Sequence, residues 1–209
     1  MIFYDCSTAP SPRRARMFIA EKGISVEVRD ISIARNEQFS EAFMAVNPNA
    51  TLPVLVTEEG LALTENNGIV AYLEARFPEP ALLGTTPQET GEIWTWNTIA
   101  EQQGGTAIAE ALRNSHPSMK GRALPGALDL EQIPELAERG RLRVAAFFDV
   151  LEKRLGESAY LAGENFSWAD ITTFVFVDFA RVIKMRIPEG NSATRDWFDR
   201  IAARPSANL

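Results

Sequence analysis

Residues 47–67, NPNATLPVLVTEEGLALTENN, constrain most strongly what this chain can fold into. Pro53 stands before the apolar run 54–56, and a proline begins a strand readily but cannot donate a hydrogen bond from a strand's interior. A second apolar run, residues 61–63, follows a short connection with a glycine at the turn, which is typical of a β-hairpin. Apolar residues then recur at helical spacing, at Ile69, Leu73 and Phe77. This stretch therefore predicts two antiparallel strands and then a helix.

Two features of this stretch suit a small anionic peptide. A backbone segment at a strand edge offers N–H and C=O groups to an extended peptide, and main-chain pairing is a common way of binding one. The predicted helix start at residues 65–67 supplies unpaired N–H groups and the positive end of a helix dipole, which favour a carboxylate. A plainer interpretation also stands, in which Pro53 only begins a strand and Glu65 and Asn66 only cap a helix.

The residues before this stretch predict a βαβ unit and a short helix. Residues 2–4 are apolar and aromatic, as in a buried strand. Ser11 as N-cap and Pro12 at the first helical position predict a helix that runs to residue 23. Residues 24–33 alternate apolar and polar as in a strand, and residues 38–46 predict a short helix. The predicted order is β-α-β-α-β-β-α.

A linker divides the chain into two predicted domains. Residues 79–87 are rich in proline and lack a regular period, so we predict one domain over residues 1–78 and a second over residues 88–209.

The second predicted domain is all-helical. One long helix is predicted from Glu89 to about Asn114, a loop over residues 115–130, and another helix over residues 134–155 with an apolar face. Ser167 and Asp170 have the spacing of a capping box, and the helix that they begin is apolar nearly all round to Ile183. A final helix is indicated by Trp197, Phe198 and Ile201.

Composition excludes several classes of protein. A net charge of -7 argues against a nucleic-acid surface, and no apolar run approaches the roughly 20 residues that span a bilayer. The first residues lack a signal-peptide pattern, so we expect a cytoplasmic protein without a membrane partner. One cysteine and one histidine exclude a disulfide framework and argue against a zinc site. Cys6 lacks a C-x-x-C partner and is expected to be structural.

NPNATLPVL followed by LTEN resembles the glutathione site of cytosolic glutathione transferases, and GENFSWADI resembles the capping motif of their second domain. The resemblance covers almost the whole chain. It implies an α/β thioredoxin-like N-terminal domain and an all-α C-terminal domain. It also implies a cis bond before Pro53, with the backbone of Leu52, beside Thr51, pairing with the cysteinyl part of glutathione. Glu65 and Asn66 would hold the γ-glutamyl end, Asn66 standing where the family usually has serine.

The same resemblance places Gln38 where family members hold the glycyl carboxylate, although polarity of a loop would also explain that residue. The enzyme must stabilise the thiolate of glutathione, because a thiol with a pKa near 8.5 is mostly protonated at neutral pH. The serine or cysteine that many members use for this falls on Ala9. Ser11 is then the candidate, assisted by the field of its helix, unless it only caps that helix.

The stretch from Tyr4 to Gly23 looks like a bacterial member similar to the atypical fungal-type transferases, which lack the usual catalytic Ser, Tyr or Cys. In that case polar groups of the helical domain, acting through water, would assist, and residues 113–116 (RNSH) are the candidates, with Arg113 foremost. Trp94 and His116 are candidates for a hydrophobic substrate site, although a core tryptophan and a surface histidine are the plainer interpretations.

The resemblance implies a glutathione transferase that uses glutathione as cosubstrate against a small hydrophobic electrophile, acts in detoxification and forms a homodimer. Two alternatives stay open, a glutathione-dependent disulfide reductase and a noncatalytic interaction module, because a fold does not by itself determine an activity.

Overall fold

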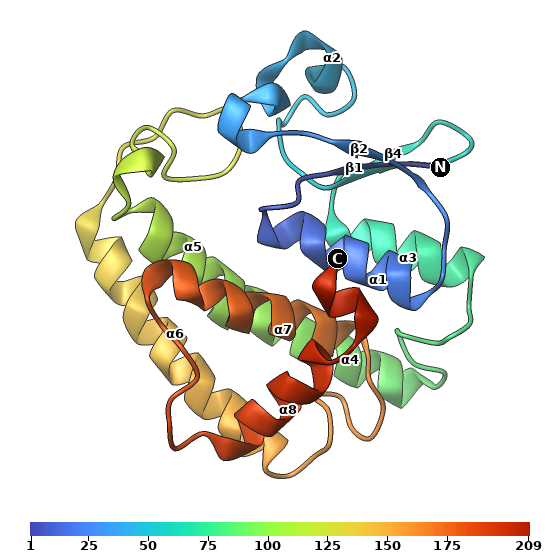
Figure 1. Ribbon diagram of the computed structural model, residues 1–209, viewed down its shortest axis with the longest axis vertical. Helices are drawn as coiled ribbons and strands as arrows, with labels where there is room; N and C mark the ends of the chain where they lie inside the picture. The colour runs from blue at the N-terminus through green and yellow to red at the C-terminus, as the bar shows by residue number, and fades with distance from the viewer. The chain divides into compact units, whose positions relative to one another are not determined.

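The computed structural model describes all 209 residues, which form two compact units (Figure 1). The first unit comprises residues 1–80 together with residues 125–127 and Leu209, and the second comprises the remainder of residues 81–208. The division after Pro80 lies within residues 79–87.

The first unit is built on a four-stranded mixed sheet in the order β2-β1-β3-β4. Strand β1 pairs in parallel with β2 and antiparallel with β3, and β3 pairs antiparallel with β4 in the predicted hairpin. The strands span Ile2–Asp5 (β1), Glu27–Asp30 (β2), Val54–Val56 (β3) and Ala62–Leu63 (β4). A parallel pair followed by an antiparallel hairpin is the thioredoxin-like arrangement that the resemblance implied.

Helices cover both faces of this sheet. Helices α1 (Pro10–Glu21) and α3 (Asn66–Arg76) lie on one face and the short α2 (Glu41–Met44) on the other (Figure 1). Tyr4 and Val54 lie opposite one another on neighbouring strands and pack with Phe43 of α2 in one buried cluster. Successive residues of a strand point to opposite faces, so the buried Phe3 and Leu55 face α1 and α3.

Three predicted boundaries in this unit were wrong. Helix α1 begins at Pro10 with Ala9 as N-cap, so Ser11 lies inside the first turn and does not cap the helix. Strand β2 covers only Glu27–Asp30, because as an edge strand it pairs on one side only and is exposed along its length. The predicted helix over residues 38–46 is interrupted, because Ser40 leaves the helical conformation and caps α2.

The second unit is helical throughout. Its helices are α4 (Pro87–Ile99), α5 (Thr106–Arg113), α6 (Pro134–Leu155), α7 (Trp168–Phe179) and α8 (Ser192–Ala202). Helix α6 has the predicted bounds, and α7 begins with the predicted capping box and is buried over its first ten residues. None of the chain's helices is long and apolar enough to cross a membrane.

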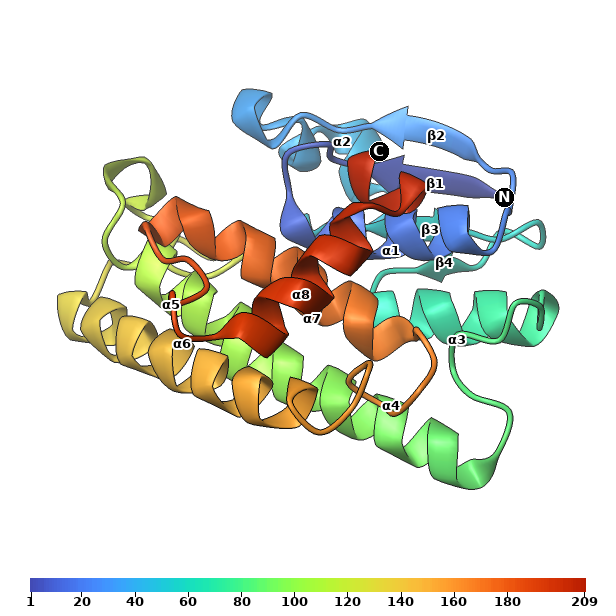
Figure 2. The ribbon, with the colours of Figure 1, turned by 60° about the horizontal axis from the view of Figure 1, so that its bottom comes forward.

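The predicted helix from Glu89 to Asn114 is present but contains a wide turn. Helices α4 and α5 form one green rod in Figure 2, joined by a π-helical turn over Ala100–Gly105. Gly104 and Gly105 pack so closely against the rings of Phe147 and Phe176 that a Cβ at either position would lie 2.7 or 2.5 Å from the ring. The bare glycine backbone therefore lets this turn approach α6 and α7.

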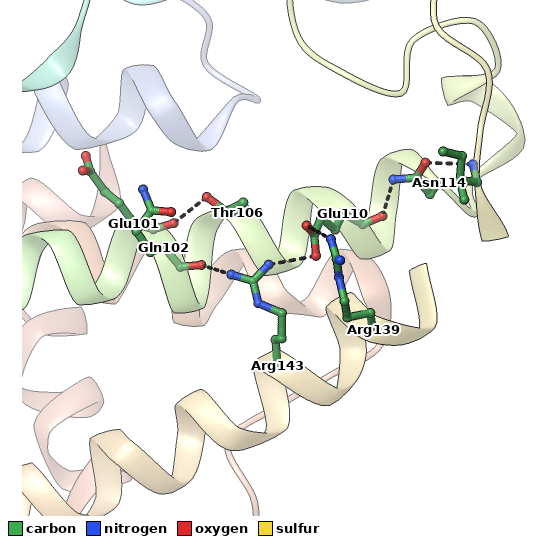
Figure 3. A network of polar contacts seen from close by, with 8 residues as sticks. Glu101, Gln102, Thr106, Glu110, Asn114, Arg139 and Arg143 are labelled. Carbon is green, nitrogen blue, oxygen red and sulfur yellow. Dashed lines mark hydrogen bonds and ion pairs between the residues drawn. The ribbon is translucent and has the colours of Figure 1, made fainter. Parts of the chain in front are cut away.

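Backbone hydrogen bonds in a π-helical turn join residues five apart, and here side chains donate further hydrogen bonds to two of its carbonyls (Figure 3). The hydroxyl of Thr106 donates to the Glu101 carbonyl at 2.9 Å, and the Arg143 guanidinium donates to the Gln102 carbonyl. Arg143 is held in turn by the Glu110 carboxylate at 2.8 Å. The irregular turn is thus closed by polar groups of α5 and α6.

Candidate functional site

The start of α1 presents one backbone donor. Its N-cap, Ala9, has no polar side chain, and Pro10 and Pro12 carry no N–H. The N–H of Arg13 already donates to the Ala9 carbonyl at 3.4 Å. The N–H of Ser11, a half-buried residue, is therefore the donor left at the positive end of this helix. The P-S-P spacing of residues 10–12 signals this donor in the sequence, although it was not among the predicted site groups.

The start of α3 is joined to the start of α1 by the side chain of Asn66. Its amide nitrogen lies 3.1 Å from the Ser11 carbonyl oxygen and 2.8 Å from the Ser11 hydroxyl. The structure therefore brings together two predicted site residues that are 55 positions apart. Asn66 is 5 % exposed, and its amide oxygen is buried without a hydrogen-bond partner. The group of Asn66 that is left without a partner is therefore an acceptor.

Glu65 is the N-cap of α3, but its side chain makes no capping hydrogen bond. The residue is exposed, so its carboxylate adds a second acceptor beside Asn66. The N–H groups of the first turn of any helix lack intrahelical partners and carry the positive end of the dipole. This helix start can therefore hold a group that has both an ammonium and a carboxylate.

The Leu52-Pro53 peptide bond is cis. The backbone N–H and C=O of Leu52 contribute no backbone hydrogen bond within the chain, so both are available to an extended peptide. The preceding turn is held by the buried Asn47, whose amide nitrogen donates to the Thr51 carbonyl at 2.8 Å and to the Thr51 hydroxyl at 3.0 Å. Asn47 supports this turn, and nothing in the sequence distinguishes it from any other turn asparagine.

Gln38 lies in a 3₁₀ turn, Glu37–Phe39, between β2 and α2. Its side chain is 4 % exposed, and its amide oxygen is buried without a partner. The general polarity of a surface loop therefore does not explain this glutamine. Gln38 and Asn66 are the two buried amides of this unit that each leave an oxygen without a partner.

The candidates in residues 113–116 lie at the end of α5, in the helical unit. Arg113 donates to the Arg122 carbonyl at 2.8 Å, and burial together with the nearby Arg122 charge lowers the pKa of its guanidinium. Asn114 is buried and used structurally, donating to the Glu110 carbonyl at 3.0 Å and accepting from the Ile133 N–H at 2.9 Å. These two side chains hold the loop that follows α5.

His116 is exposed and caps a 3₁₀ turn, with its Nδ1 2.7 Å from the Ser118 hydroxyl. Trp94 is half-buried near the opposite end of the α4–α5 rod. Nineteen residues separate Trp94 from Arg113, which at the rise of an α-helix is roughly 30 Å. The structure therefore does not bring Trp94 and His116 together as the walls of one small pocket.

Cys6 is buried and free, with its sulfur 3.5 Å from the Thr8 hydroxyl. The backbone N–H of Cys6 donates to the Asp5 carboxylate, which also binds Arg16 of α1 at 2.6 Å. Cys6 thus belongs to the structural contact between β1 and α1, as its lack of a partner cysteine indicated.

Comparison with known proteins agrees with both units. Residues 8–76 match the model of the glutathione S-transferase N-terminal domain, and residues 111–205 match that of the C-terminal domain. Glutathione S-transferase 2 of Saccharomyces cerevisiae is 33% identical over 208 residues, which cover 99% of this chain and 87% of the yeast protein. The disulfide-bond oxidoreductase YfcG of Escherichia coli is 27% identical over 97% of this chain and 91% of its own length.

Among solved structures, Gtt2 from Saccharomyces cerevisiae matches with a TM-score of 0.90 and 32% identity, covering 100% of this chain and 99% of that one. The fold class inferred from the sequence, a thioredoxin-like unit followed by a helical one, is therefore confirmed. This chain belongs to the glutathione S-transferase family.

Proposed function

We propose that this protein binds glutathione in its N-terminal unit, activates the thiol there, and transfers the sulfur to a small hydrophobic electrophile. The observation that carries the proposal is the junction of two helix starts, where Asn66 and Ser11 are hydrogen-bonded beside acceptors and donors that the chain itself does not use. Buried polar atoms without partners are uncommon in folded proteins, so their presence at this junction favours a ligand.

The polar groups of this site match the ends of the tripeptide. The γ-glutamyl ammonium is a donor, and it suits the Asn66 amide oxygen and the Glu65 carboxylate, which are both acceptors. The neighbouring α-carboxylate suits the N–H groups of the first turn of α3. The cysteinyl residue pairs with the backbone of Leu52, beside Thr51 and Pro53, and the glycyl carboxylate accepts from the NH₂ group of Gln38, since the Gln38 amide oxygen is itself an acceptor.

The thiol is activated at the start of α1. A thiol with a pKa near 8.5 is a weak nucleophile at neutral pH, and an anion beside a helix start is stabilised by the dipole and by directed N–H groups. Ser11 supplies one such N–H and a hydroxyl. Lowering the thiol pKa by about two units requires roughly 2.7 kcal/mol, which a few charge-assisted hydrogen bonds supply.

A direct test uses the wild-type protein and glutathione. Glutathione is expected to raise the unfolding temperature, and the ultraviolet absorption of its thiolate, titrated in the complex, is expected to show a pKa well below 8.5. S-methylglutathione, which has no titrating thiol, is the control for the absorption. Absence of binding would remove the proposed function, and binding with an ordinary thiol pKa would leave only a noncatalytic glutathione-binding module.

A second candidate function is reduction of glutathione mixed disulfides, favoured by the similarity to a disulfide-bond oxidoreductase of Escherichia coli. Because Cys6 is buried and has no partner cysteine, the sulfur chemistry would run through glutathione. The bound thiolate would attack the glutathionyl sulfur of the mixed disulfide, so that a new S–S bond forms glutathione disulfide while the substrate S–S bond breaks. The substrate sulfur would leave as a thiolate and take up a proton. Turnover of a model disulfide against that of a model aryl halide ranks the two reactions.

We further propose that the enzyme is a cytoplasmic homodimer, which light scattering on a size-exclusion column tests. For the helical unit we propose that Arg113 contacts the electrophile or a catalytic water, with the neighbouring His116 as a second candidate, whereas Trp94 lies too far along the α4–α5 rod to share a small substrate with them. Replacing Arg113 by Ala is expected to lower kcat/KM for the electrophile without changing glutathione affinity. Because Arg113 also holds the loop after α5, the unfolding temperature must be measured alongside.

A further inference from the structure

We propose that Asn66 is a positioning residue for Ser11. Asn66 takes no part in proton transfer, but it sets the direction of the Ser11 hydroxyl, so that this hydroxyl donates a hydrogen bond to the thiolate. The inference rests on the proposed function and deepens it, because it explains how a chain with alanine at position 9 still activates a thiol. The observations are two short contacts, one unpaired buried atom and the two prolines of α1.

The orientation of the Asn66 amide follows from its neighbours. One neighbour, the Ser11 carbonyl oxygen at 3.1 Å, can only accept a hydrogen bond. The amide must therefore turn its NH₂ group toward Ser11, because the opposite orientation would set two acceptors against each other. One N–H reaches the carbonyl, and the other reaches the Ser11 hydroxyl oxygen at 2.8 Å.

The direction of the Ser11 hydroxyl follows in turn. Its oxygen accepts from Asn66, so its own proton points away from Asn66. A hydroxyl that accepts one hydrogen bond becomes a better donor in the next, because the two bonds polarise each other. The N–H of Ser11 is the donor that Pro10 and Pro12 leave at this helix start. Residue 11 therefore offers an N–H and an oriented O–H to a single anion.

The buried amide oxygen of Asn66 supplies an independent sign of a ligand. It has no partner within the chain, although Asn66 is only 5 % exposed. An asparagine that served only to join two helices would not need this unpaired acceptor, which costs free energy to bury. One side chain thus faces the α1 start with its nitrogen and the glutathione amine with its oxygen. This couples recognition of the γ-glutamyl end to activation of the thiol.

The test is a thiolate titration of bound glutathione in three variants, Ser11→Ala, Asn66→Ala and the double variant. Each single variant is expected to raise the thiol pKa by about one unit, the effect of one lost hydrogen bond to an anion. The double variant is expected to raise it no further, because Asn66 acts on the thiol only through Ser11. The affinity for glutathione should fall with Asn66→Ala in both backgrounds, since that contact does not involve Ser11.

Asn66→Ser provides a second variant that restores the residue the family usually has at this position. Its hydroxyl is too short to span the distance to Ser11, so we expect glutathione affinity near that of the wild type but a thiol pKa raised as in Asn66→Ala. A serine exposed between α1 and β2, Ser25, gives the matched control: Ser25→Ala is expected to leave the titration unchanged.

The outcomes separate the two proposals. If the wild type fails to lower the thiol pKa, the proposed function is wrong. If the wild type lowers it but Asn66→Ala and Asn66→Ser both leave it unchanged, Asn66 has no positioning role. If Asn66→Ala raises the thiol pKa by the same amount in the wild type and in the Ser11→Ala variant, Asn66 acts on the thiol directly, which also overturns the inference.

Discussion

The starts of helices α7 and α3 differ in whether their buried polar side chains have hydrogen-bond partners within the chain. At α7 the buried Asp170 accepts four hydrogen bonds, from the Leu161 N–H, the Ser167 N–H and hydroxyl, and the Trp197 indole, all at 2.9–3.0 Å. At α3 the nearly as deeply buried Asn66 keeps an oxygen without any partner. One helix start is closed by its own side chains and the other is open.

The difference agrees with a structural role for the start of α7 and with the proposed binding role for the start of α3. Four donors converge on Asp170 because the carboxylate ties α7 and α8 to the loop before them, and this use leaves nothing for a ligand. Burial raises the pKa of the Asp170 carboxyl, against the effect of its hydrogen bonds. Asn66 and Ser11 join two helices as well, but the buried Asn66 oxygen has no hydrogen-bond partner within the chain. An open helix start sacrifices some stability for binding.

The largest expected effect is at the closed start. Asp170→Ala leaves buried donors of Leu161, Ser167 and Trp197 without partners, and each such group costs about 1–3 kcal/mol, so the free energy of unfolding should fall by about 4 kcal/mol. Urea unfolding followed by tryptophan fluorescence measures it.

Asp170→Asn serves as the control, since the amide oxygen can still accept from two donors, and we expect about half the loss. A loss below about 1 kcal/mol for Asp170→Ala would mean that water replaces the carboxylate and that this start is not closed.

A smaller effect is expected at the π-helical turn, where side chains of the helical unit also bind backbone carbonyls. Arg143→Met removes the donor to the exposed Gln102 carbonyl and one partner of Glu110, and should cost about 1 kcal/mol. Arg139→Met removes only an exposed partner of Glu110 and should cost a few tenths of a kcal/mol. If Arg143→Met and Arg139→Met lower the free energy of unfolding by the same amount in thermal unfolding, the hydrogen bond from Arg143 to the turn contributes nothing.

At the open start the effect on stability should be smaller still. Asn66→Ala loses two hydrogen bonds to the half-buried Ser11, which water can replace, and removes an unpaired buried oxygen. We expect the free energy of unfolding without ligand to change by less than about 1 kcal/mol. The stabilisation that glutathione adds should shrink at the same time. A loss as large as that of Asp170→Ala would make Asn66 a structural cap.

The smallest effect is a pH dependence in the helical unit. Burial acts to raise the pKa of Glu110, but the hydrogen bonds and charges of Arg139 and Arg143 prevail and lower it below 4.5. The unfolded chain then binds a proton more readily than the folded one, so this stability is present above pH 4.5 and is lost as the pH falls through the folded pKa. When the free energy of unfolding is plotted against pH between about 6 and 3, its slope should be smaller in Glu110→Gln than in the wild type. An unchanged slope would show that the two arginines do not hold this carboxylate.

Much of the secondary structure could be predicted because its signals are local. The capping box of Ser167 and Asp170 and the helix over residues 134–155 are present as predicted, since caps and apolar periodicity act within a few turns. The start of α1 was predicted two residues too late, because Pro10 and Pro12 both suit a first turn and a local rule cannot choose between them.

The order of strands and helices, the capped helix starts and the family were determined by the sequence itself, because they depend on residues close together in the chain. The link between Asn66 and Ser11 was decided only by the tertiary structure, since 55 positions separate them and the fold must bring α1 beside α3 before an amide can reach a hydroxyl. The π-helical turn was decided in the same way. Its glycines allow the turn, but the rings of Phe147 and Phe176 and the guanidinium of Arg143, all supplied by other helices, hold it in place.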